Sequence, residues 1–137
     1  MYSEAEAHLA NLDFCSTRVL RRAYLVIVLA AERAGYDTGP KDAARELQIR
    51  DKEGRQPFVL MVNAGHLLFC LRAPAFDDRP GLVGEAHNRF DGRLRVADGF
   101  LQDVQVRIES VEDAEDVIDW LFSAGSFSPG YGERRSA

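Results

Sequence analysis

The sequence predicts an α+β fold: a mostly antiparallel sheet of about four strands in two hairpins, with a buried N-terminal helix and a C-terminal amphipathic helix on one face. The first hairpin is indicated by residues 57–72, where two apolar runs flank the turn Asn63-Ala64-Gly65. The second is indicated by two alternating segments on either side of Asp98-Gly99. Helical apolar periodicity precedes the first hairpin and follows the second, an order that favours α+β.

Length and composition indicate one domain. The chain has 137 residues, of which 46% are hydrophobic, and this is enough for a single hydrophobic core. We expect residues 1–123 to form one α+β domain. Residues 124–137 are rich in Ser and Gly and lack apolar periodicity, so we expect them to form a flexible tail.

The N-terminal part predicts a weak helix over residues 3–12 and then a strong one. Ser16 or Thr17 is the expected N-cap of the strong helix, and Gly35 is the residue expected just beyond its end. Because residues 24–31 are apolar on every side of this helix, we expect it to be covered on more than one side. A sheet with a second helix, or a second copy of the chain, would supply that cover.

The middle of the chain is more irregular. Gly39-Pro40 predicts the start of a short helix that continues to residue 49, and residues 51–54 then break the chain. Residues 73–81 are expected to form a loop because they contain Pro74 and Pro80. Residues 82–90 fit either a short helix or an irregular crossing.

The C-terminal part predicts two strands and a helix. Residues 93–97 and 104–109 alternate in polarity as strands do. Ser110 is the expected N-cap of the last helix, with Asp113 at the capping-box position. The net charge of the chain is -5, and the excess acid lies in residues 109–119, where it suits the positive end of the helix dipole.

Composition also limits which cellular location and which kinds of chemical site we expect. The longest apolar run, residues 23–31, is too short for the ~20 residues that a membrane helix needs, so we expect no membrane partner. Cys15 and Cys70 stand apart in apolar surroundings, which favours buried thiols and a cytoplasmic location. No metal-binding, phosphate-loop or nucleophile-elbow motif occurs in the sequence, so no metal and no cofactor are expected.

Arginines are the first group of candidate binding residues. Three of them occupy the first turns of the strong helix, where positive charge opposes the helix dipole and calls for an anionic neighbour. That neighbour is either an internal carboxylate or a phosphate of nucleic acid contacted with the help of arginines on a strand face. No aromatic side chain stands among these arginines to stack on a base. The full set is Arg18, Arg21, Arg22, Arg72, Arg93, Arg95 and Arg107.

A polar pocket is the second candidate site. Tyr24, His66 and His87, with Arg72 nearby, are the polar groups that a small-molecule sensor would use. His66 and Cys70 cannot form a catalytic dyad on a regular strand, because four residues separate their Cα atoms by ~13 Å. A hydrolase-type enzyme using His66, His87 and Asp77-Asp78 is therefore the least favoured function.

These observations favour a small, non-catalytic, bacterial-type interaction or accessory module that acts through protein contacts as a homodimer. The alternatives that stay open are an accessory protein that binds nucleic acid through its arginines, a small-molecule sensor and the hydrolase-type enzyme.

Overall fold

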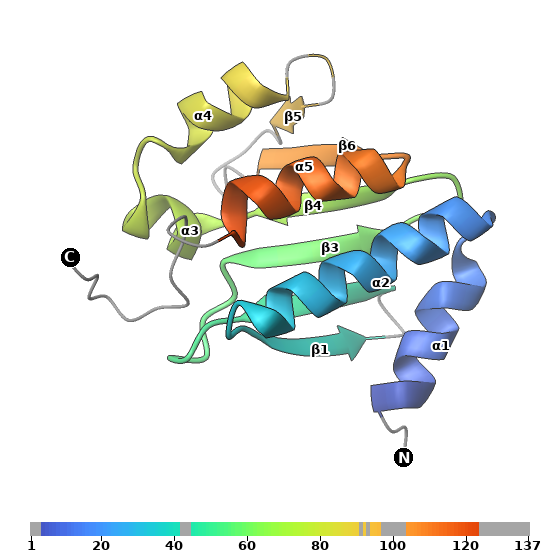
Figure 1. Ribbon diagram of the computed structural model, residues 1–137. Helices are drawn as coiled ribbons and strands as arrows, with labels where there is room; N and C mark the ends of the chain where they lie inside the picture. The colour runs from blue at the N-terminus through green and yellow to red at the C-terminus, as the bar shows by residue number, and fades with distance from the viewer. Residues whose placement is uncertain (1–3, 42–44, 91, 93, 97–103, 124–137) are drawn as a thin grey trace.

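The computed structural model describes residues 4–41, 45–90, 92, 94–96 and 104–123. Five helices and six strands lie within these residues (Figure 1). Along the chain they are α1 (Glu4–Phe14), α2 (Arg18–Arg33), β1 (Asp37–Lys41), β2 (Glu46–Arg50), β3 (Phe58–Val62), β4 (Leu67–Leu71), α3 (Ala73–Asp78), α4 (Leu82–Arg89), β5 (Leu94–Val96), β6 (Val104–Ile108) and α5 (Val111–Leu121). The α+β class is confirmed.

The strands form one antiparallel sheet in the order β1-β2-β3-β4-β6-β5. Both predicted hairpins are present, since β3 pairs with β4 and β5 pairs with β6. The β4–β6 pair, with Phe69 opposite Val106, joins the two hairpins into a single sheet. Residues 97–103, which include the predicted turn at Asp98-Gly99, lie outside the described residues, as does the segment 124–137.

Helices α2 and α5 cover one face of the sheet, which we call the inner face (Figure 1). Alternate strand residues point into this layer, so that Leu60, Phe69 and Val106 are fully buried against the two helices. The chain direction, shown by the colour gradient, is the same in both helices (Figure 1). Their neighbouring positions and common direction decide which side chains they expose together on the far side.

The helix ends follow the expected local rules. The Thr17 side chain accepts a hydrogen bond from the Leu20 N–H at 3.2 Å, and Gly35 has a φ of 98° just after α2. Ser110 accepts from the Asp113 N–H at 3.0 Å, as an N-cap should. The Asp113 carboxylate accepts in turn from the Glu109 N–H at 2.8 Å, one residue before the expected capping-box donor.

The helix predicted from Gly39-Pro40 to residue 49 is wrong, because the segment forms the edge hairpin β1–β2. Pro40 fits an edge strand, where its missing N–H costs no ladder bond. Alternation in β2, with Leu47 and Ile49 buried between less buried polar residues, was the period-two pattern that favoured a strand. A Cβ at Gly39 would lie 2.7 Å from Nη2 of Arg50, so the flexible end of that side chain would have to move to admit one. The added hairpin brings the sheet of described strands to six instead of about four.

The loop predicted over residues 73–81 is also wrong in part, because α3 occupies residues 73–78. Pro74 sits in the first turn of α3, where a proline interrupts no helical hydrogen bond. Pro80 follows the C-cap Arg79 and separates α3 from α4. Of the two alternatives for residues 82–90, the short helix is the one observed.

Candidate interaction face on helices α2 and α5

Helix α2 exposes large apolar side chains on the side away from the sheet. The exposed fractions are 45% for Val19, 44% for Leu25 and 51% for Leu29. A single exposed aliphatic residue is ordinary in a soluble protein, but Leu25 and Leu29 lie one turn apart on α2 and together form a small exposed apolar surface. The predicted cover of α2 by a sheet and a second helix is present, and within the described residues this third side stays open.

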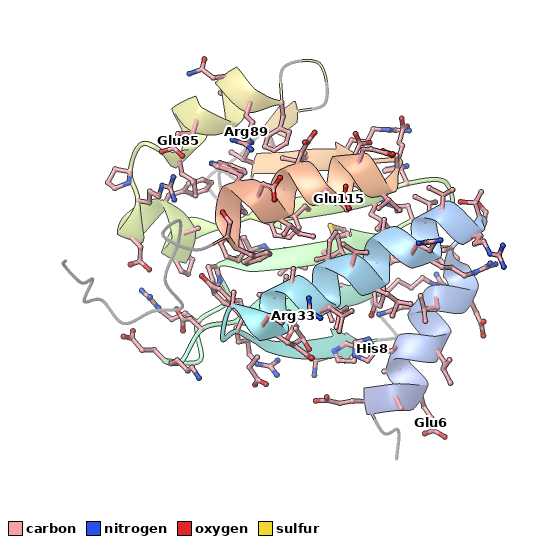
Figure 2. All side chains as sticks on the ribbon, in the orientation of Figure 1. Glu6, His8, Arg33, Glu85, Arg89 and Glu115 are labelled. Atoms are coloured by element: carbon pink, nitrogen blue, oxygen red, sulfur yellow. The ribbon has the colours of Figure 1, made fainter. Side chains whose placement is uncertain are left out.

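An open groove of ≈ 360 Å³ runs between α2 and α5 on the same side. Its apolar floor comes from both helices, and charged side chains stand along it. The lining residues are Val26, Leu29, Ala30 and Arg33 from α2 and Glu115, Ile118 and Asp119 from α5. Figure 2 shows Arg33 near the end of α2 and Glu115 on α5, on the side of the helices that faces the viewer. We call this groove, together with exposed Arg18, Val19, Arg22, Leu25 and Glu112, the outer face.

The two helices carry opposite charges on the outer face. Arg18, Arg22 and Arg33 are exposed on α2, and their guanidinium groups have no hydrogen bond or ion pair within the described part of the chain. The side-chain carboxylates of Glu112, Glu115 and Asp119 on α5 are likewise exposed and have no such contact within the described residues. The outer face therefore has an apolar centre, a basic row and an acidic row.

Arg21 differs from its two neighbours because it has internal partners. Its Nε donates to the Leu12 carbonyl at 3.3 Å, and its Nη2 donates to the Cys15 carbonyl at 3.3 Å. At the α1–α2 junction Arg21 therefore meets two neutral backbone carbonyls in place of the anionic neighbour expected for this helix start. Arg18 and Arg22 stay directed to the exterior.

The remaining candidate arginines lie elsewhere. Arg107 alternates with buried β6 residues, so its side chain leaves the sheet on the face opposite α2, where it pairs with Glu109 at 2.7 Å. Arg72 is the half-buried N-cap residue of α3, and Arg95 lies opposite Gln105 in the register of β5 and β6. Arg93 lies outside the described residues. Arg107 and the exposed arginines of α2 consequently lie on opposite faces of the sheet.

The residues considered for a polar pocket are also separated. Tyr24 is fully buried, and its hydroxyl lies 2.8 Å from His8 Nδ1 and 3.1 Å from Asn11 Nδ2. Burial raises the pKa of Tyr24 to about 12, although the hydrogen bond from Asn11 acts the other way. Because this hydroxyl is held between α1 and α2, it belongs to the core and not to an open site.

The two histidines considered with Tyr24 occupy different ends of the fold. His66 follows the β3–β4 turn beside Asn63, and its pKa is lowered by burial and by the nearby Arg107 charge. His87 is exposed on α4, and Asp77-Asp78 belong to α3, beyond the far end of β4 from His66. The groove between α2 and α5 contains none of these side chains.

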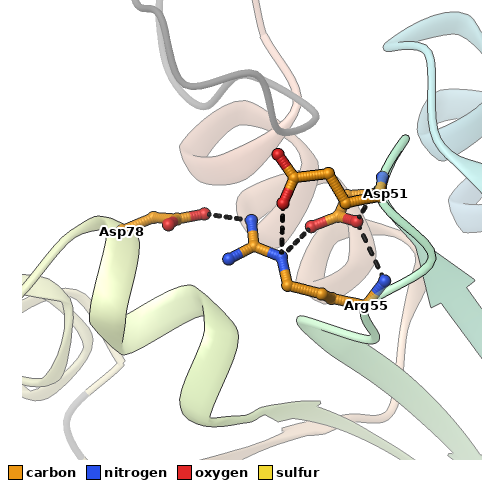
Figure 3. A network of polar contacts seen from close by, with 4 residues as sticks. Asp51, Arg55 and Asp78 are labelled. Atoms are coloured by element: carbon orange, nitrogen blue, oxygen red, sulfur yellow. Dashed lines mark hydrogen bonds and ion pairs between the residues drawn. The ribbon is translucent and has the colours of Figure 1, made fainter.

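A polar network that the sequence did not reveal ties the β2–β3 turn to α3 (Figure 3). The buried Asp51 carboxylate accepts from the backbone N–H groups of Glu53 and Arg55 and from Arg55 Nε at 2.8 Å. Arg55 Nη2 then reaches Asp78 at 2.9 Å. An Asp at the start of a turn often accepts hydrogen bonds from the backbone N–H groups of that turn. The contact with Asp78 on α3 could not be predicted in this way, because the two segments come together only in the folded chain.

Metal and thiol chemistry gain no support from the described residues. Among them, no group of three His, Cys, Asp or Glu side chains could hold a metal ion. Cys15 and Cys70 are buried and lie outside any disulfide, and burial raises the pKa of Cys15 despite the neighbouring Arg21.

No helix in the described part of the chain is long and apolar enough to cross a membrane. Comparisons with protein-family models, with curated proteins and with solved structures find no match to this chain. Its function is therefore inferred from the outer face and its charges.

Proposed function

We propose that this chain is a small, non-catalytic interaction module that works through protein contacts and forms a homodimer through its outer face. The observation that carries the proposal is the apolar surface of Leu25 and Leu29, which continues into a groove lined by charges of both signs. Interfaces of this kind bury an apolar centre and leave a polar rim in contact with water.

A substitution at the centre of this surface tests the proposal. Leu29→Glu places a charge where the dimer would exclude water, so the variant is expected to stay monomeric at concentrations at which the wild type is dimeric. Sedimentation velocity over protein concentrations from about 1 µM to about 100 µM measures the difference.

The matched control is Leu9→Glu on α1, because Leu9 is 58% exposed and lies outside the outer face. This control should dimerise as the wild type does. Equal dimerisation by Leu29→Glu and the wild type would reject the outer face as the contact surface.

Nucleic-acid binding is a second candidate function, and one observation favours it. Arg18 and Arg22 lie one turn apart at the start of α2, exposed and without a partner in the described residues. Guanidinium groups at a helix start suit phosphate oxygens. The net charge of -5 argues against nucleic-acid binding, because the phosphates are negatively charged as well.

Fluorescence anisotropy with labelled DNA and RNA over a salt series tests this second function. Binding that weakens linearly in the logarithm of salt, and that Arg18→Glu with Arg22→Glu abolishes, would support it. Lys52→Glu is the control, because Lys52 is exposed on the β2–β3 turn. An absence of binding at low salt would exclude it.

A further inference from the structure

We propose that the two copies pair about a two-fold axis parallel to α2 and α5, so that α2 of each copy packs over α5 of the other. This inference rests on the proposed homodimer and names its arrangement. In a two-fold interface each contact occurs twice, because the same surface serves both copies. The outer face must therefore be complementary to itself.

The charges of the outer face are complementary under this particular rotation. The two helices lie side by side and run in the same direction (Figure 1). A half-turn about an axis along the groove exchanges the places of the two helices and keeps their direction. The basic row of α2 then meets the acidic row of α5 on both sides of the axis.

The lining of the groove indicates which residues can pair between the copies. Arg33 and Leu29 of α2 line it together with Ile118 and Asp119 of α5, so the half-turn superposes the parts of the two helices that contain these residues. After the half-turn, Arg33 of one copy faces Asp119 and Glu115 of the second copy. Leu29 meets Ile118 at the apolar centre, and symmetry repeats each contact.

A two-fold axis perpendicular to the helices gives a poorer match. It would place α2 over α2 and α5 over α5, with the two chains antiparallel. Glu112, Glu115 and Asp119 of the two copies would then lie in facing acidic rows without an intervening base, and like charges that face each other across an interface disfavour association. The charge pattern therefore selects the axis parallel to the helices.

A charge exchange between two variants tests the arrangement. The first variant is Arg33→Glu, and the second combines Glu115→Arg with Asp119→Arg. Each variant alone brings like charges together twice, so each should dimerise at least about tenfold more weakly than the wild type. An equimolar mixture should form heterodimers with an affinity within about threefold of the wild type, because both contact sites regain opposite charges.

Energy transfer between differently labelled copies detects the heterodimer. Lys52→Glu, which makes the same charge change as Arg33→Glu but on an exposed turn, is the control for that variant. Recovery of dimerisation when the two variants are mixed also shows that both variants are folded. A wild type that dimerises while the mixture stays dissociated would overturn the arrangement and leave the homodimer standing. Single variants that dimerise as tightly as the wild type would overturn it as well, whereas a monomeric wild type would reject the proposed function itself.

Discussion

Buried polar side chains show how single residues hold the helices in place. The Tyr24 hydroxyl bridges His8 and Asn11, and Asn11 Nδ2 also donates to the Glu46 carbonyl at 3.2 Å. These bonds attach α1 to α2 and to the edge hairpin. The sequence marked Tyr24 as a polar group within an apolar helix, but its partners lie 13 and 16 residues away and on another helix, so no local pattern could identify them.

Tyr24→Phe should lower the free energy of unfolding by about 1–3 kcal/mol. The change removes the hydroxyl and leaves buried Asn11 and part-buried His8 without that partner. Urea denaturation measures the loss, with an unchanged slope showing that the folded and unfolded states are otherwise comparable. A variant as stable as the wild type would mean that the hydroxyl contributes nothing to the attachment of α1.

Glu85 provides a pH-dependent contact between α4 and α5. Its Oε1 accepts from the Trp120 indole at 2.9 Å and from Arg79 Nη2 at 2.6 Å. These hydrogen bonds lower the pKa of Glu85, with that from Trp120 the larger cause. A carboxyl group with a lower pKa in the folded state stabilises the fold above its unfolded pKa of about 4.3, and that contribution is lost as the pH falls through the folded pKa.

The wild type should therefore lose more stability than Glu85→Gln between about pH 5 and pH 3. Thermal unfolding at a series of pH values measures both curves. Glu112→Gln removes an exposed carboxylate without a partner among the described residues, so it should keep the steep wild-type dependence. Parallel curves for wild type and Glu85→Gln would contradict the role given to Glu85.

At the scale of elements, local patterns predicted some parts well and failed where tertiary contacts decide. The central hairpin, the Thr17 and Ser110 caps and the Gly35 helix end follow from short-range rules and are present. Gly39-Pro40 fits both a helix start and an edge strand, and only pairing with β2 selects the strand. Alternation within β2 was a usable signal, whereas the short helix α3 and its Arg55–Asp78 contact, which joins segments far apart in the sequence, left no local signal.

Asp51→Ala should destabilise the fold by about 2–3 kcal/mol, because it leaves two backbone N–H groups and Arg55 without their buried acceptor. Asp78→Ala should cost less than about 1 kcal/mol, since its contact with Arg55 is partly exposed and screened by water. Chemical denaturation of both variants compares the two ends of the network. Equal losses would contradict the view that the turn, and not its link to α3, carries most of the stabilisation.

At the scale of the whole molecule, one sheet with helices on its inner face gives the chain its outer face. The apolar run of α2 and the acidic run of α5 were each visible in the sequence. The sequence did not reveal that α2 and α5 lie side by side, because this depends on the order in which β4, β6 and α5 come together. The expectation of a homodimer came from the apolar circumference of α2, and the structure adds the location and charges of the side of α2 that stays exposed among the described residues.

Sedimentation equilibrium of the wild-type chain tests the central claim most directly. If the outer face joins two copies, the average mass should rise from the 15.3 kDa of one chain towards twice that value as the protein concentration increases from about 1 µM to about 100 µM. A mass that stays at 15.3 kDa over the whole range would contradict the account.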